Sequence, residues 1–109
     1  MEEPNDQIVS TLIEAKCNLN IPNMDGYTPL MKAIYADNVY VATKLIDAKC
    51  DINAQNKNGD TALIIATMQY NVHVVKLLIA AKCDLDINNQ NGDTAISIVS
   101  SMHDLLHVD

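Results

Sequence analysis

The sequence contains no tryptophan and no phenylalanine, and only 4% of its 109 residues are aromatic. A hydrophobic core must therefore be built mainly from aliphatic and small side chains, which supply most of the 49% hydrophobic content. Glycine and proline number three each, too few for a disordered or low-complexity chain. These absences favour one folded domain made of thin layers of stacked helices over a large β-sandwich.

Clusters of basic residues are absent too. Seven Lys and Arg stand against 14 Asp and Glu, which gives a formal charge of −7. A surface of this sign repels phosphate backbones and so excludes nucleic acid as a partner. No apolar run reaches the roughly 18 residues of a membrane span, and the acidic opening of the chain is unlike a signal peptide. We expect an intracellular, cytoplasmic protein that has no membrane partner.

The three cysteines, Cys17, Cys50 and Cys83, are spaced 33 residues apart. In stacked helical layers they would lie about 8–10 Å apart, and a disulfide needs Cα atoms within about 7 Å. We therefore expect three buried free thiols. His103 and His107 flank an acid, as in a helical zinc motif, but no third ligand is identifiable, so we predict no metal site.

One stretch of the sequence recurs at a fixed interval. Residues 56–66 (Asn-Lys-Asn-Gly-Asp-Thr-Ala-Leu-Ile-Ile-Ala) have counterparts at 23–33 and 89–99, so the step is 33 residues. Internal repetition of this length indicates a solenoid, in which each unit packs on its neighbours.

Each unit predicts a turn, a helix, a second turn and a second helix. The tight turns are expected at Asp25-Gly26, Asn58-Gly59 and Asn91-Gly92. A threonine then caps the first helix, at Thr28, Thr61 and Thr94, and these helices run to about residues 35, 68 and 101. The second helices are expected to be capped by Asn38, Asn71 and Asp104. Their apolar face begins as Ile8, Val9, Leu12 and Ile13 and returns twice in the same phase.

The repeat resembles the ankyrin repeat, which has a 33-residue period and a Thr-Pro-Leu-His-x-Ala signature. The nearest match is Gly-Tyr-Thr-Pro-Leu-Met-Lys-Ala at residues 26–33. The resemblance implies an all-α, ankyrin-like solenoid with projecting loops or β-hairpins. It divides the single domain, 1–109, into a half-unit (7–22), two full units (23–55 and 56–88) and a truncated unit (89–109).

Two departures from the family pattern are visible. The signature histidine is replaced by Met31, Ile64 and Ser97, so we expect its hydrogen bonds between loop and helix to be missing. The glycine that usually follows the second helix is replaced by Lys16, Lys49 and Lys82. If these lysines keep a left-handed backbone, each costs about 1 kcal/mol relative to glycine.

No nucleophile and base pair, phosphate-binding loop or paired carboxylates stand out, so we expect neither an enzyme nor a cofactor. The resemblance instead implies a protein-binding concave face made of loop tips and first helices. Its candidate tip residues are Met24, Asp25, Tyr27, Lys57, Asn58, Asp60, Gln90, Asn91 and Asp93. Its candidate helix residues are Tyr35, Ala36, Met68, Gln69, Ser101 and Met102.

Tyr27, Tyr35, Met24 and Met68 favour the amino-terminal half as the energetic centre, because aromatic residues and Met are enriched at interfaces. Alternatively, Tyr35 and Met68 merely cover the helices beneath them. We expect a monomer that binds a protein partner as an adaptor or inhibitor. Two other hypotheses stay open: end-to-end self-association through the incomplete end units, and a scaffold segment of a larger protein.

Overall fold

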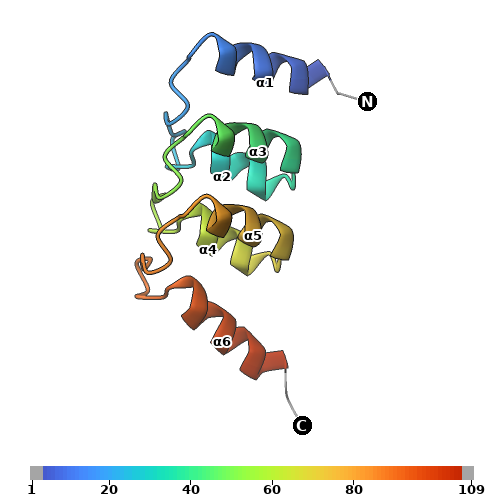
Figure 1. The fold of residues 1–109 in the computed structure, drawn as a ribbon. Coiled ribbons are helices and arrows are strands. Elements are labelled where there is room, and N and C mark those ends of the chain that lie inside the picture. The colour runs from blue at the N-terminus through green and yellow to red at the C-terminus, as the bar shows by residue number, and fades with distance from the viewer. Residues whose placement is uncertain (1–3, 107–109) are drawn as a thin grey trace.

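The computed structural model describes residues 4–106, and side chains are described for residues 5–101. This range holds six helices: α1 (Pro4–Glu14), α2 (Pro29–Tyr35), α3 (Val39–Asp47), α4 (Ala62–Met68), α5 (Val72–Ala80) and α6 (Ala95–Leu106). Figure 1 shows them as a stack, with the long connecting loops all on one side. The expected all-α fold is confirmed. Within residues 4–106 the projecting loops are turns without strands.

The first helices begin as the sequence predicts. Thr28 has an extended backbone, and its Oγ1 accepts a hydrogen bond from the Met31 amide at 3.3 Å, while Pro29 opens α2. Thr61 caps α4 in the same way, through the Ile64 amide at 3.2 Å. These bonds satisfy amides that the first turn of a helix leaves without partners.

The second helices are capped by asparagine in both full units. Asn38 accepts from the Val41 amide at 3.1 Å, and Asn71 accepts from the Val74 amide at 3.2 Å. The prediction that Asp104 caps a further helix is wrong, because α6 continues unbroken to Leu106. A break between helices places a residue in the left-handed region, as at positions 37 and 70. In both full units the packing of the following helix offsets that strain, and within residues 4–106 no helix follows α6.

The second helices end where the sequence places Ala-Lys-Cys. Lys16, Lys49 and Lys82 have φ of 60°, 66° and 64°, so the expected left-handed backbone is confirmed. In the full units the following cysteine amide bonds back to a leucine carbonyl, as in Cys50 to Leu45 at 3.2 Å. This is the Schellman pattern, which satisfies the last carbonyls of a helix.

The core lies between helices of one unit and between units. α2 packs on α3 and α4 on α5, while α4 also contacts α2 and α6, and α3 contacts α1 and α5. Cys50 and Cys83 are buried in this core, as expected, but Cys17 is exposed. The prediction fails at Cys17 because α1 has no first helix of its own unit beside it. Among the described residues, no helix is long and apolar enough to cross a membrane.

Candidate protein-binding surface

The loop tips are built by an asparagine that precedes each turn. In the second unit the Oδ1 atom of Asn56 accepts hydrogen bonds from the amides of Asn58 and Asp60, both at 2.9 Å. Asn23 and Asn89 do the same in their own tips, at 3.0 Å. These asparagines recur at the 33-residue step, within the stretches rich in Asn and Asp that favour turns because their short side chains bond nearby backbone.

Successive tips are joined by backbone hydrogen bonds. The Lys57 amide donates to the Asp25 carbonyl at 3.3 Å, and the Gln90 amide donates to the Asn58 carbonyl at 3.0 Å. The tips therefore form one continuous row.

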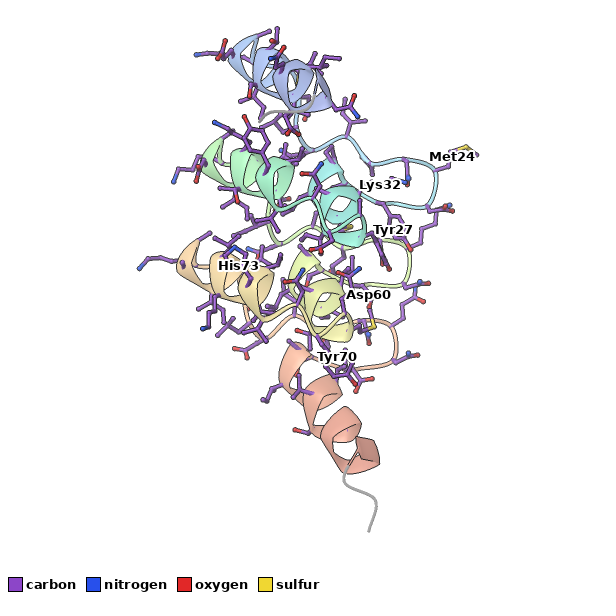
Figure 2. The ribbon with its side chains drawn as sticks, turned by 90° about the vertical axis from the view of Figure 1, so that its right-hand side faces the viewer. Met24, Tyr27, Lys32, Asp60, Tyr70 and His73 are labelled. Atoms are coloured by element: carbon purple, nitrogen blue, oxygen red, sulfur yellow. The ribbon has the colours of Figure 1, made fainter. Side chains whose placement is uncertain are left out.

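The structure places most of the candidate residues on the accessible side of this row and of the first helices. Figure 2 shows the loops on the side of Met24, Tyr27 and Asp60, with His73 of α5 on the far side. Met24 is 89% exposed, Tyr35 44% and Met68 37%. The other exposed candidates are Asp25, Ala36, Lys57, Asn58, Gln69, Gln90, Asn91 and Ser101, whereas Tyr27 and Asp93 are half-buried. The side chain of Met102 lies outside the described residues.

Asp60 is not the free tip residue that the sequence suggested. Its side chain is buried, with 7% exposed, and its Oδ1 accepts from Asn89 Nδ2 at 3.0 Å. The carboxylate thus links the second tip to the third. Asp60 lies in the interface between two units, so the turn pattern of one unit does not predict how exposed its side chain is.

Ser97 corrects a second expectation. We expected the hydrogen bonds of the signature histidine to be absent, yet Ser97 Oγ accepts from the Thr94 amide at 2.9 Å and lies 3.0 Å from Asp93 Oδ1, to which it donates. A serine at this position therefore ties the loop to the helix. At the equivalent Met31 and Ile64 the side chain is apolar and fully buried.

Tyr27 and Tyr35 form the most distinctive feature of the face. Their ring centroids are 5.2 Å apart and the rings are tilted by 37°, a geometry favourable for aromatic pairs. A side-chain hydrogen bond with Tyr27, burial, and the charges of Tyr27 and Asp60 raise the pKa of Tyr35 to about 12. The pair lines a hollow of about 380 Å³ together with Lys32 and Ala36. Lys32 was not among the residues predicted from the sequence.

The loop tip that packs against Gly26 holds a buried amide without an acceptor. Asn56 is 7% exposed, and its Nδ2 atom has no hydrogen-bond partner. One unit later the equivalent Nδ2 of Asn89 is satisfied by Asp60. Tyr27 occupies the position of Asp60 in the first unit, because the two residues are 33 apart. An unpaired buried donor costs about 1–3 kcal/mol, so Tyr27 stands at a position where an acceptor would stabilise the fold.

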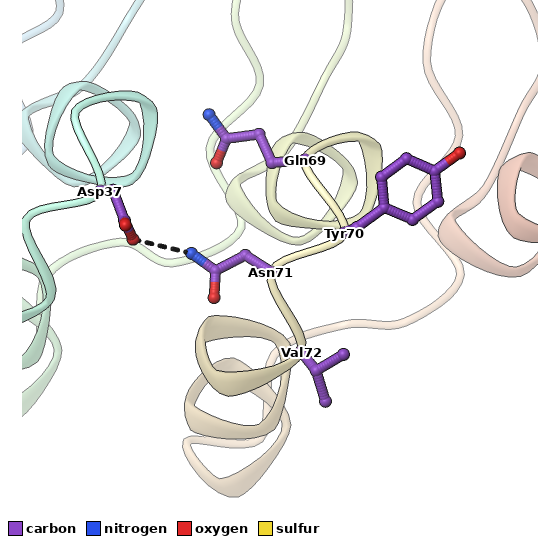
Figure 3. A pocket seen from close by; sticks show the side chains of 5 residues that line it. All are labelled: Asp37, Gln69, Tyr70, Asn71 and Val72. Carbon is purple, nitrogen blue, oxygen red and sulfur yellow. Dashed lines mark hydrogen bonds between the residues drawn. The ribbon is translucent and has the colours of Figure 1, made fainter.

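A second hollow, of about 570 Å³, lies at the turns between paired helices. Figure 3 shows its lining, in which Asn71 Nδ2 donates to Asp37 Oδ1 at 3.1 Å while the Tyr70 ring points away from that pair. Tyr70 has φ of 58° and is 59% exposed. Sequence reasoning missed it, because tyrosine carries no preference for a left-handed turn.

The described residues include no group of three or more His, Cys, Asp or Glu side chains that could hold a metal ion. The side chain of His103 and all of His107 lie outside the described residues, so this statement does not extend to them.

Two family models match the chain. A model for ankyrin repeats in many copies matches residues 12–66, and a model for the ankyrin repeat matches residues 58–90. The chain belongs to the ankyrin repeat family. Domains of this family generally act as protein-binding modules and are typically non-catalytic. No curated protein matches the chain at a significant level.

A solved structure shows the same ankyrin fold. The crystal structure of the ankyrin repeat domain of Bcl-3, a member of the IkappaB protein family, superposes with a TM-score of 0.76 at 23% sequence identity. The match covers 79% of this chain but only 38% of that one. At this identity the likeness establishes the fold of the chain.

Proposed function

We propose that this ankyrin domain binds a protein partner through its concave face, with Tyr27 and Tyr35 as the energetic centre. The observation that carries the proposal is the unpaired Nδ2 of Asn56, because its counterpart in Asn89 bonds to Asp60, the residue equivalent to Tyr27. Natural sequences usually satisfy buried donors, and exceptions gather at functional sites. A role in binding accounts for a tyrosine at a position where an aspartate would supply the missing acceptor.

The chemistry of the pair also suits an interface. Tyr35 is 44% exposed and is held by Tyr27 at a centroid distance of 5.2 Å. A tyrosine that is already oriented loses little conformational entropy on binding, and it offers both an apolar ring and a hydroxyl. The Tyr35 hydroxyl is protonated at neutral pH, as in an ordinary tyrosine, and its hydrogen bond with Tyr27 helps to raise its pKa to about 12.

The surrounding residues extend the surface. Met24 on the first tip and Met68 at the end of α4 add exposed, flexible apolar side chains. Lys57, Asn58, Gln90 and Asn91 add polar groups along the row of tips. A central apolar cluster with a polar rim is the usual anatomy of a protein interface.

The test is affinity capture from cells that make the protein, with three baits. These are the unaltered chain, a Tyr27→Ala/Tyr35→Ala variant, and a matched His73→Ala/Lys76→Ala variant of α5, where both side chains are exposed. We expect a partner that is captured by the unaltered chain and by the α5 variant and is lost with the tyrosine variant.

The thermal unfolding of each bait should be recorded in parallel. A partner retained by the tyrosine variant would contradict the proposal. Loss of binding together with loss of the folded state would show that the tyrosines are structural, because Tyr27 also packs on the core.

A further inference from the structure

Within residues 4–106, α1 and α6 each lack a second helix of their own unit to pack on. α2 packs on α3 within one unit, and α4 packs on α5 within the next. α1 stands in the stack as a second helix without a first, and α6 stands as a first helix without a second. Figure 1 shows both as single helices at opposite ends of the array.

At the amino-terminal end, the exposure of equivalent residues shows how much apolar surface α1 leaves uncovered. Leu12, Leu45 and Leu78 occupy one position of the second helix, 33 residues apart. Leu45 and Leu78 are 4% and 0% exposed, but Leu12 is 50% exposed. An apolar groove beside Leu12, lined also by Val9, Ile13 and Leu45, lies where a first helix would pack.

At the carboxyl-terminal end, α6 likewise leaves apolar surface exposed. Leu30, Leu63 and Ile96 share one position of the first helix and are 2%, 4% and 71% exposed. A groove of about 340 Å³ runs between α5 and α6 and is lined mostly by apolar side chains, among them Val75, Ile79, Ile96 and Val99. Such a groove accepts the apolar face of an amphipathic helix.

We propose that a second copy of the chain fills both places, so that α1 of one copy packs against α6 of the next. The argument for this occupant is the phase of α1. Its apolar residues stand 33 and 66 positions before those of α3 and α5, the helices that fill the equivalent grooves beside α2 and α4. The composite pair of α6 and α1 would therefore repeat the helix pairing of both full units.

The loop tips favour the same arrangement. Within the chain, the Lys57 amide donates to Asp25 and the Gln90 amide donates to Asn58. The next step of this row pairs the Met24 amide of a second copy with the Asn91 carbonyl. Gly92 has no atom within 4 Å of the place where a Cβ would stand, whereas the equivalent place at Gly59 is filled by the next tip. The last tip is thus open to another tip.

The contact joins two different surfaces, so it does not close on itself. It propagates into head-to-tail chains of copies. Each copy carries a formal charge of −7, which opposes association and is screened by salt. We therefore expect weak assembly that strengthens as the salt concentration rises.

The test uses sedimentation velocity over a concentration series at low and high salt. The unaltered chain should exceed its monomer mass of 12.0 kDa as concentration and salt increase. A mass that stays at 12.0 kDa overturns the inference, provided the series reaches about 1 mM, where contacts worth only about 4 kcal/mol are half-formed.

Two single-end variants sharpen the test. Leu12→Asp blocks the amino-terminal face and Ile96→Asp blocks the carboxyl-terminal face, and both positions are exposed enough for the monomer to keep its helix content. Each variant alone should remain monomeric. An equimolar mixture should form a heterodimer and nothing larger, because one intact joint remains between the two variants.

A third variant separates this inference from the concave-face proposal. Tyr35→Asp lies on the concave face, away from both ends, and should assemble like the unaltered chain. If Tyr35→Asp abolishes assembly, or if mixing the two end variants restores no dimer, the proposed joint is wrong. Neither result bears on whether the concave face binds another protein.

Discussion

Asn89 donates a hydrogen bond from Nδ2 to Oδ1 of Asp60 over 3.0 Å, across the interface between the second and third units. The equivalent pair in the preceding interface is Asn56 and Tyr27, and there the Nδ2 atom has no acceptor. The interface between the second and third units therefore has a charged acceptor for its asparagine, whereas the interface between the first and second units leaves a buried donor unpaired. The difference arises from a single side chain.

Tyr27→Asp should supply the missing acceptor. Any substitution of Tyr27 loses its ring contacts, so the informative comparison is with Tyr27→Ala. We expect the aspartate variant to be more stable than the alanine variant by about 1–3 kcal/mol, the value of satisfying a buried donor with a charged acceptor. Urea unfolding followed by circular dichroism measures the difference.

Tyr27→Glu is the control for charge alone, since a negative group near the start of α2 gains about 0.3–1 kcal/mol from the helix dipole. Glutamate carries the same charge on a longer side chain that does not reproduce the Asp60 geometry. Equal stabilities of the aspartate and glutamate variants would show that the hydrogen bond to Asn56 does not form.

Gly59 and Gly92 offer a matched pair for the stacking of tips. Both have a left-handed backbone, with φ of 80° and 81°. A Cβ at Gly59 would lie 2.8 Å from the Gln90 amide nitrogen, whereas at Gly92 nothing lies within 4 Å. Gly92→Ala should cost about 1 kcal/mol from the backbone alone. Gly59→Ala should cost a further 1–3 kcal/mol because the tips must separate. Equal losses in thermal unfolding experiments would contradict this account.

The repeat, the helices and most caps could be predicted from the sequence, because they depend on local chemistry. Thr28 and Asn38 cap their helices through their own side chains. Pro29 suits the first position of α2, because its φ is fixed near the helical value and no amide is needed there. The left-handed lysines followed from the phase of the repeat and the family resemblance.

What could not be predicted depends on the neighbouring unit. The turn pattern makes Asp60 a tip residue, and only the contact with Asn89 shows that it is buried. Cys17 has the same sequence context as Cys50, yet the helix that would cover it is missing. For the candidate surface, the row of exposed tips was predictable, but the partnerless Asn56 amide and the Tyr27–Tyr35 geometry were not.

Lys49→Gly should stabilise the chain by about 1 kcal/mol, because Lys49 holds φ of 66°, a region in which an L-residue is strained and glycine is not. Lys76→Gly is the matched control within α5, and it should destabilise the chain by about the same amount. Thermal unfolding midpoints that move in opposite directions would support this interpretation. A loss of stability in both variants would show that the aliphatic stem of Lys49 matters more than its backbone strain.

The buried thiol of Cys50 should make stability fall at alkaline pH. Burial, aided by the negative charge of Asp51, raises the pKa of Cys50 from 9.0 to about 11. The unfolded chain therefore loses this proton at a lower pH than the folded chain does. The sign follows from linkage: the contribution of Cys50 is fully present below pH 9.0 and is lost as the pH rises through about 11.

Cys50→Ala removes this titration, so its free energy of unfolding should decline less between pH 8 and pH 10.5 than that of the unaltered chain. Cys17→Ala removes an exposed thiol and is the matched comparison for the loss of a sulfur atom. Urea unfolding at each pH gives the slopes, and the ionisation of other groups contributes equally to the unaltered chain and to Cys50→Ala. Parallel slopes for these two proteins would mean that burial of Cys50 does not oppose its ionisation.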